Sequence, residues 1–357
     1  MRCIGLAIPL PMAKHKNIPI FIPHKGCPNQ CVFCNQKTIS GSNGYTLSNV
    51  RAKIEDTLAH ANEDDCIEIA FFGGSFTGID REEMLSLLSL ANEYLKAKKI
   101  CGIRLSTRPD YISREILDIL TFYGVTDIEL GVQSLSESVL NCCRRGHSAA
   151  TTKAACRLIL EYGCFRLVGQ MMLGLPGSTR EAEIATANEL FEIGVHAIRI
   201  YPTVVLNATP LADMLKEGSY IPLSLNEAVQ RAADILLLAD QHKIPCLRVG
   251  LCENEDLHNE NGMMEGPFHP AFGELAISEV FFRNCQKVLG NAPLSEKEIH
   301  LLIPKGCLSK AIGQKRNNLN RLTELYQTKR IRFIESDALS GYQVRTQEDY
   351  CIASQIT

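Results

Sequence analysis

Three cysteines near the N-terminus have a spacing that suits metal binding. Cys27, Cys31 and Cys34 follow a short apolar run with the pattern C-x3-C-x2-C. Thiolates are soft ligands that favour zinc or an iron–sulfur cluster. Structural zinc normally takes four ligands, and His24 is the nearby residue that would complete such a set. On a cubane [4Fe–4S] cluster, three cysteines leave one iron without a protein ligand, and an open iron can bind a substrate or cofactor.

Polar residues also stand at the ends of other apolar runs. Arg108, with Asp110 shortly after it, suits either an ion pair or contact with an anionic ligand. Gln133 and Ser134 end a run whose other side chains are apolar, so they need hydrogen-bond partners that a ligand could supply. Gln170 lies inside a further run and is either a core amide with partners or a group that faces a ligand. Tyr201 could line a substrate site, but a packed aromatic side chain is the simpler interpretation. The acidic loop at 253–260 suits a solvated loop better than a metal site, and His269 lies in a turn that could reach a substrate.

Alternating strands and helices are predicted to position these residues. Short β-branched runs alternate with amphipathic stretches, two of which begin with capping-box spacing, Ser178 to Glu181 and Ser224 to Glu227. This order indicates an α/β fold with a parallel sheet, and mostly apolar runs are expected for strands covered on both faces. Periodicity alone fits an open sheet, a full barrel and a partial barrel equally well, and each places chemistry on the loops after the strands. The expected strands are 19–22, 67–72, 103–107, 128–132, 167–173, 197–201 and 247–251, and the expected helices are 81–96, 113–122, 149–161, 180–193 and 226–241.

Composition bounds the class of protein. The chain has 357 residues, 45% of them apolar and 22% charged, which excludes extended disorder. It contains no apolar run of about 18 residues and no secretory signal, which predicts a cytoplasmic protein without a membrane span. The fifteen cysteines are an odd number without a disulfide framework, and Cys142 and Cys143 are expected on a helix remote from the motif. Most cysteines outside the motif are expected to be reduced and buried, including Cys101, Cys156, Cys164 and Cys246.

The C-terminal residues differ in charge and pattern from the rest. The net charge is −3, yet residues 297–332 contain nine Lys or Arg and two Glu. We therefore expect a first region, 1–290, and a basic module, 291–357. The order strand 298–303, helix 307–312, turn 313–316, helix 317–326 and strand 330–334 resembles the core of a KH domain, whose turn contacts a single-stranded nucleic-acid backbone. The resemblance implies RNA contacts by Lys315 and Arg316, and a solvated α+β cap on the first region is the alternative.

Placed after the first strand, the pattern C-x3-C-x-aromatic-C, with Phe33 as the aromatic residue, resembles the radical S-adenosylmethionine (radical SAM) superfamily. The resemblance implies a partial (β/α) barrel, a [4Fe–4S] cluster held by the three cysteines, and S-adenosylmethionine bound at the open iron. One electron, from a donor such as flavodoxin or ferredoxin, then cleaves this cofactor to methionine and a 5′-deoxyadenosyl radical. The loop after the second strand would bind the methionine amino group, and polar residues of later strands its carboxylate, ribose or adenosine. The implied cofactor-binding residues are Phe33, Gly73, Gly74, Ser75, Arg108, Gln133, Ser134 and Gln170.

Further segments resemble one subfamily. Between about residues 18 and 250, the chain is similar to the radical domain of the catalytic (third) subunit of Elongator and its bacterial relatives. That resemblance implies modification of carbon 5 of the wobble uridine in transfer RNA. Two features depart from the pattern: the first two cluster cysteines are closer together, and the residues after Pro293 do not read as the subfamily's acetyltransferase domain. The segments that carry the resemblance are 71–77, 106–110, 129–134, 144–147, 169–177 and 200–203.

Two other functions remain open. An oxygen-independent coproporphyrinogen-oxidase-like enzyme would share the cysteine spacing and act on a small molecule. A non-catalytic RNA-binding protein would use its iron–sulfur cluster only for structure. The Thr-Arg-Pro-Asp, Arg-Gly-His and Tyr-Pro-Thr segments favour the Elongator-like function over the first. The Gly-Gly and Gln-Ser segments argue against the second, because a structural cluster needs neither. The sequence leaves the transferred group, the reductant and the oligomeric state open.

Overall fold

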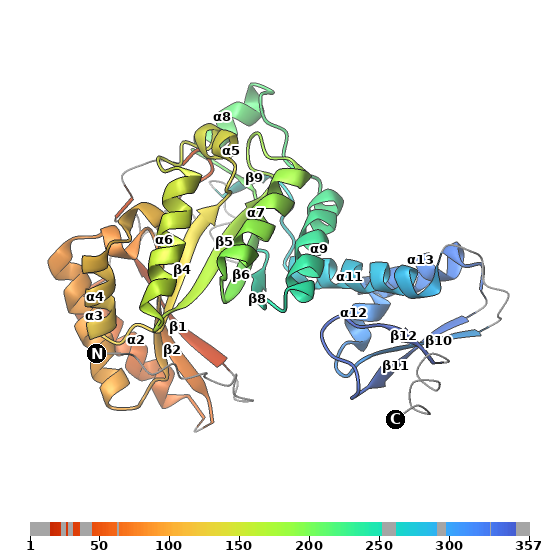
Figure 1. Cartoon of the computed structure of the whole chain (residues 1–357), viewed down its shortest axis with the longest axis horizontal. Coiled ribbons are helices and arrows are strands. Elements are labelled where there is room, and N and C mark those ends of the chain that lie inside the picture. Colours follow the sequence, from red (N-terminus) through yellow and green to blue (C-terminus); the bar gives the residue numbers. More distant parts are fainter. Residues whose placement is uncertain are drawn as a thin grey trace.

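The computed structural model describes residues 15–22, 26–27, 31–35, 45–62, 64–251, 262–290, 298–328 and 330–347. Its larger part is a sheet of seven parallel strands in the order β1-β2-β3-β4-β5-β6-β8. Helices cover its outer face, and the curved sheet forms the half-barrel that the resemblance implied (Figure 1). The strands are β1 (His15–Ile22), β2 (Cys66–Gly73), β3 (Gly102–Thr107), β4 (Asp127–Gln133), β5 (Arg166–Leu173), β6 (Ala197–Pro202) and β8 (Cys246–Val249).

Helices follow most of these strands and connect them. Two short helical turns, η1 (Phe76–Gly78) and η2 (Pro109–Tyr111), follow β2 and β3, and a small two-stranded sheet pairs β7 (Val205–Leu206) with β9 (Met263–Glu265). In the described ranges, no helix has the length and apolarity needed to cross a membrane. The helices are α2 (Leu47–Ala59), α3 (Arg81–Lys96), α4 (Arg114–Phe122), α5 (Glu137–Cys142), α6 (Ala149–Tyr162), α7 (Arg180–Ile193), α8 (Pro210–Lys216), α9 (Leu225–Gln241) and α11 (Phe272–Leu289).

Most elements match the ranges predicted from the sequence. All seven predicted strands are present, and α3 and α7 have the predicted bounds. Ser224 caps α9 as predicted, but α7 is capped by Thr179 instead of Ser178, because the Thr179 hydroxyl accepts a hydrogen bond from the third residue of the helix. Three helices, α2, α8 and α11, were not predicted from the sequence. In α2 the buried apolar residues are Val50 and Ile54, a stripe too sparse to recognise as an amphipathic pattern.

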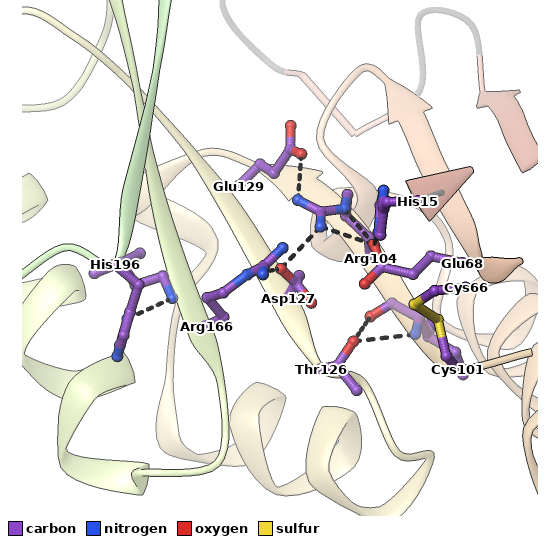
Figure 2. Close-up of polar contacts among 12 residues, drawn as sticks. His15, Cys66, Glu68, Cys101, Arg104, Thr126, Asp127, Glu129, Arg166 and His196 are labelled. Atoms are coloured by element: carbon purple, nitrogen blue, oxygen red, sulfur yellow. Dashed lines mark hydrogen bonds and ion pairs between the residues drawn. A yellow bond between two sulfur atoms is a disulfide. The ribbon is translucent and has the colours of Figure 1, made fainter. Parts of the chain in front are cut away.

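The two faces of the sheet differ in polarity. On the outer face, side chains such as Ile69 on β2 are fully buried beneath helices. The inner face carries charged residues, and Arg104 on β3 is only 1% exposed. Figure 2 shows its ion pairs with Glu68 (2.7 Å), Asp127 (3.0 Å) and Glu129 (2.9 Å). The strands are therefore buried on both faces, as expected, but ion-paired charges interrupt the apolar character of the inner face.

The C-terminal residues form a small module at the end of α11 (Figure 1). β11 pairs in parallel with β10, and β12 (Arg345–Thr346) pairs antiparallel on the other side of β10. The second half of α11 contributes Phe281, Phe282 and Cys285 to the apolar core of this module. One helix therefore packs against both the barrel and the module. The predicted β-α-turn-α-β order is present as β10 (Glu298–Pro304), α12 (Leu308–Ile312), η3 (Gln314–Arg316), α13 (Asn317–Leu325) and β11 (Arg330–Ser336).

The cysteines outside the motif differ in burial and bonding, and Cys164 and Cys246 are partly buried and form no disulfide with another described residue. Cys156 on α6 is fully buried, as expected for a thiol used as a small apolar side chain. Cys101 is exposed and forms a disulfide with Cys66, with 5.7 Å between their Cα atoms. The expectation that Cys101 is a reduced, buried thiol was wrong, because it lies in the turn before β3 and not inside that strand.

Candidate functional site

The cysteine motif lies in the loop after β1. Backbone hydrogen bonds connect this loop to the end of α5 and to α8. Cys31 is 4% exposed, and Cys27 and Cys34 are half-buried. Between the last two cysteines, the Val32 nitrogen donates to the carbonyl of Cys143 at 3.2 Å, and the Val32 carbonyl accepts from a backbone N–H of α8 at 2.9 Å. The expectation that Cys143 lies remote from the motif was therefore wrong, because the end of α5 lies directly against this loop.

Arg145 joins the cysteine loop to β4. It lies just beyond α5 and is 6% exposed. Its Nη1 donates toward the Sγ of Cys31 at 3.2 Å, and its Nη2 donates to the carbonyl of Gly131 at 2.6 Å. Sequence reasoning noticed this arginine only within the segment Arg-Arg-Gly-His and did not select it. The available signal was an arginine beside a glycine after a short helix, which does not show that the side chain reaches a cysteine.

The glycine loop after β2 packs closely against the end of β1 and the cysteine loop. Gly73 has a φ of +119°, and a Cβ there would lie 2.4 Å from the carbonyl oxygen of Ile22, so a larger residue would be strained. The Gly74 nitrogen donates to the same carbonyl at 3.1 Å. A Cβ on Gly26 would lie 2.2 Å from the carbonyl oxygen of Ser75. The two loops therefore meet backbone to backbone.

Ser75 and Arg108 link the glycine loop to the end of β3. Ser75 is fully buried, and its Oγ lies 2.8 Å from the hydroxyl of Thr107 and accepts from the Arg108 nitrogen at 3.1 Å. Arg108 forms two hydrogen bonds of 2.9 Å with Asp110 and donates to the carbonyl of Arg145 at 2.7 Å. The ion pair weighed from the sequence is thus present. It leaves Arg108 Nη1 buried without a partner among the described residues.

Gln133 ends β4 in a conformation that residues with side chains rarely adopt. Its φ is +64°, at an irregularity in the pairing with β5. The residue is 7% exposed, and its Oε1 has no partner within the described residues. Gly131 lies beside both Gln133 and Arg145. A Cβ added at Gly131 would lie 3.4 Å from Gln133 Nε2 and 3.0 Å from Arg145 Nη2. The neighbouring Ser134 instead accepts a hydrogen bond from the Ser136 nitrogen at 3.1 Å and so stabilises a turn.

The other candidates lie farther from these contacts. Gln170 is half-buried on β5, paired across the sheet with the glycine-containing end of β4. Phe33 packs against apolar residues behind the cysteine loop. Tyr201 accepts a hydrogen bond from an inner-face arginine at 3.2 Å, and His269 accepts one from the N-cap nitrogen of α11 at 3.0 Å. His24 and the acidic loop lie outside the described residues.

His147 is a further buried polar residue that the sequence analysis did not select. Its Nε2 is buried without a partner among the described residues. Burial, reinforced by the positive charge of Arg145, lowers the pKa of His147 to about 4. The imidazole is therefore neutral at neutral pH and can accept or donate a hydrogen bond without adding charge.

Lys315 and Arg316 lie in the small module, in the turn between α12 and α13. Both are exposed, and neither forms an ion pair with a described residue. Their φ values are +51° and +63°, which lie in the left-handed region that residues with side chains rarely adopt. They line a groove of about 430 Å³ between the start of α11 and the α12–η3 segment, together with Lys310.

The donor set fits the cluster and cofactor that the resemblance implied. Three soft thiols lie in one loop, and burial raises the pKa of the Cys27 thiol while the charges of Arg108 and Arg145 act to lower it. The unpartnered atoms of Arg108 and Gln133 are a donor and an acceptor for a polar ligand. Within the described ranges, no three His, Cys, Asp or Glu side chains are arranged as a metal site. The fit therefore rests on the type of donor and on these unpartnered atoms.

Comparison with known proteins identifies the barrel. Residues 21–190 match the Radical SAM superfamily, and residues 195–281 match the radical SAM C-terminal domain. The tRNA uridine(34) acetyltransferase of Methanocaldococcus infernus is 30% identical over 200 residues, which are 50% of this chain and 37% of that protein. Human Elongator complex protein 3 is 31% identical over 266 residues, with 60% of this chain and 48% of that protein covered. The chain thus spans less than half the length of either relative.

A solved structure shares the fold. The archaeal Elp3 of Methanocaldococcus infernus has a TM-score of 0.59 at 23% identity, with 75% of this chain and 62% of that chain covered. Together, the two family matches cover most of the barrel and α11. The chain therefore belongs to the radical SAM superfamily, and its cofactors are a [4Fe–4S] cluster and S-adenosylmethionine.

Proposed function

We propose that this protein generates a 5′-deoxyadenosyl radical in order to modify carbon 5 of the wobble uridine in transfer RNA. The observation that carries the proposal is the similarity of its barrel to a protein named tRNA uridine(34) acetyltransferase. The similarity to Elongator complex protein 3 supports it. Because the chain spans less than half of each relative, the proposal covers the radical step and names no acetyl donor.

When bound, the cluster supplies the electron that cleaves S-adenosylmethionine. Cys27, Cys31 and Cys34 hold the cluster in this proposal, and the close packing of Gly73 and Gly74 lets the backbone approach the methionine amino group. Side chains then orient the rest of the cofactor. Buried side chains around the loops exclude water from the site in this proposal and so protect the radical from side reactions.

The unpartnered polar atoms have complementary tasks in this proposal. Arg108 Nη1 is a buried cationic donor, which suits the cofactor carboxylate. Gln133 Oε1 is a buried acceptor, which suits a ribose hydroxyl. Gln170, half-buried on the next strand, is within the same end of the barrel and is assigned to adenosine. Ser75 and Ser134 support these groups by fixing the loops that carry them.

The small module is proposed to bind the RNA. Lys315 and Arg316 present two positive charges on an exposed turn, without an ion-pair partner in the described part of the chain, beside a groove that also contains Lys310. Arg321, also in the basic region, is bound to Glu279 at 2.9 Å and lies 3.5 Å from the ring of Phe282, so its task is to hold α13 against α11. A wobble base already lies in a loop, so little unpairing is needed to present it to the barrel.

A flavodoxin or ferredoxin is the proposed electron donor, because the sequence contains no second cysteine motif for a relay cluster. The cytoplasm, where transfer RNA and these carriers meet, is the proposed location.

One experiment tests the substrate, and a second tests the chemistry. Modified nucleosides in bulk transfer RNA from a deletion strain and its parent are compared by mass spectrometry. Loss of one modified uridine from the deletion strain is expected, whereas an unchanged profile would move the substrate to a small molecule. Formation of 5′-deoxyadenosine by the anaerobically reduced protein is expected as well. Its absence from a protein with full iron content would indicate a non-catalytic cluster.

A further inference from the structure

Cys66 and Cys101 form a disulfide that joins the start of β2 to the turn before β3, at the opposite end of the sheet from the cysteine motif (Figure 2). Their Cα atoms are 5.7 Å apart, a distance at which a bridge forms without movement of the backbone. The Cys101 Sγ also lies 3.2 Å from the carbonyl oxygen of Ile67, so the reduced thiol has a hydrogen-bond acceptor in place. The same backbone therefore accommodates both the two thiols and the disulfide.

The surroundings of the pair favour a bond that opens and closes. Cys101 is exposed, whereas Cys66 is partly buried. Lys98 and Lys99 lie on the same exposed turn as Cys101, and nearby positive charge favours the thiolate, which is the reactive form of cysteine. In the cytoplasm, the location proposed above, a disulfide is usually transient, catalytic or redox-sensing. Because this pair lies at the other end of the sheet from the site, redox sensing is the task that remains.

We propose that Cys66 and Cys101 are a reversible oxidation site, and that the closed disulfide stabilises the barrel when the cluster is absent. The oxidant is a peroxide. The Cys101 thiol takes one oxygen from hydrogen peroxide, which leaves as water, and becomes a sulfenic acid. The Cys66 thiol then attacks this sulfur, so that an S–S bond forms, the S–O bond breaks and a second water leaves. A dithiol reductant reopens the bond and is itself oxidised to a disulfide.

The bond encloses the segment of chain that carries the glycine loop. The two cysteines are 35 residues apart, and β2, Gly73, Gly74 and α3 lie between them. This glycine loop packs backbone to backbone on the cysteine loop. A cluster bound only by the folded chain stabilises the fold, so its loss weakens the segment that rests on the cysteine loop. A disulfide stabilises by restricting the unfolded chain, and the oxidant that destroys an iron–sulfur cluster also closes this bond. The gain therefore arises under the conditions that cause the loss.

The test is the thermal unfolding of the full-length, cluster-free protein, followed by circular dichroism in three states. These states are reduced, treated with hydrogen peroxide, and reduced again with dithiothreitol. Differential alkylation and peptide mass spectrometry measure the fraction of Cys66 linked to Cys101 in each state. Cys101→Ser removes the bond at an exposed position, and Cys307→Ser, at a partly buried thiol of the small module, is the matched control.

We expect peroxide to link Cys66 to Cys101 and to raise the unfolding temperature of the parent by about 5–10 °C, as a closed loop of this length predicts. Dithiothreitol should reverse both changes. Cys307→Ser should respond like the parent, and Cys101→Ser should unfold at the temperature of the reduced parent in all three states.

Three results would overturn the proposal: no link after peroxide, a link without a rise in unfolding temperature, or a link that dithiothreitol does not open. An equal rise in Cys101→Ser would also overturn it, because oxidation of the motif cysteines would then be the cause. The reconstituted Cys101→Ser protein should form 5′-deoxyadenosine at the parent rate under anaerobic reduction. This test therefore fails or succeeds separately from the tests of radical formation and of transfer RNA as the substrate.

Discussion

At the scale of single residues, the site is built from loops that approach one another without intervening side chains. Gly26 and Gly73 let the cysteine loop and the glycine loop meet backbone to backbone. Polar atoms of Arg108, Gln133 and His147 are buried there and have no hydrogen-bond partner among the residues that the structure describes. Unpartnered buried polar atoms are rare in folded proteins, so their gathering beside the cysteine motif indicates a polar ligand.

The three cysteines should each be required for the cluster. Replacing any one with alanine leaves two thiolates and two irons without protein ligands. We expect each Cys→Ala variant to lose iron, measured colorimetrically, and to form no 5′-deoxyadenosine. Cys307→Ala, in the small module, is a suitable control, whereas Cys143→Ala is not, because the Cys143 side chain is buried in the cluster that includes Val32 of the cysteine loop. Cofactor cleavage at the parent rate by a Cys31→Ala protein would contradict the ligand assignment.

His147 should make the fold less stable in mild acid. Burial, together with the charge of Arg145, lowers its pKa to about 4 in the folded protein, whereas an unfolded histidine titrates near 6.5. The unfolded state therefore binds a proton first, and stability falls as the pH drops from about 6.5 toward 4. In urea unfolding across this range, His147→Gln should lose less stability than the parent. His60→Gln, at an exposed histidine, should follow the parent; identical slopes in all three proteins would exclude His147 as the source.

At the scale of elements, a charge network holds the inner faces of neighbouring strands together. Arg104 on β3 bridges Glu68 on β2 with Asp127 and Glu129 on β4, and the network continues to β5 through Arg166 at 2.5 Å from Asp127 (Figure 2). Within this network, burial alone would raise the pKa of Glu68, but His15 and Arg104 outweigh it and hold that pKa well below its usual range. The network lies toward the start of the strands, while the site lies at their ends.

Removing Arg104 should destabilise the barrel strongly. Loss of one partner from a buried ion pair leaves uncompensated charge and costs about 3–5 kcal/mol. We expect Arg104→Met to lower the free energy of unfolding in urea by this amount. Arg114→Met breaks an exposed pair with Glu161, which is worth about 1 kcal/mol or less. Equal losses in the two variants would show that the inner network contributes no more than a surface pair.

At the scale of the whole molecule, α11 connects the barrel to the small module. Its first half packs on the barrel and its second half supplies core residues to the small module. This shared helix fixes the basic turn relative to the barrel, which a flexible linker would not do. We propose that the two regions, 1–290 and 291–357, divide the work between radical generation and RNA binding.

The basic turn should determine the affinity for transfer RNA. Lys315→Glu with Arg316→Glu removes two phosphate contacts, so binding should weaken and the dependence of affinity on salt should become shallower by about one unit of slope per contact. The measurement is a binding titration at two salt concentrations. Lys98→Glu with Lys99→Glu, on the exposed turn before β3, is the charge-matched control. Formation of 5′-deoxyadenosine without RNA should persist in both; unchanged affinity and slope in the first would leave the module a structural cap.

The sequence by itself determined the family and most of the elements and led to the proposed cluster ligands, because each of these depends on a local pattern. Three closely spaced cysteines are a local signal for one shared cluster, and hydrophobic periodicity indicates strands and helices over short windows. The KH-like order and the basic turn were readable for the same reason. Arg108 was also found locally, since it directly follows a strand.

The tertiary structure decided which distant residues complete the site. Arg145 and Cys31 are separated by 114 residues, and they meet because the sheet curves and α5 turns back toward the end of β1. No local pattern encodes that contact. Likewise, no local pattern indicated that the Ser75 hydroxyl bonds to residues at the end of β3, or that charged side chains lie on the inner face of the sheet. Curvature of the sheet is a sum of small twists over many strands, so the partners it brings together cannot be deduced from any one segment.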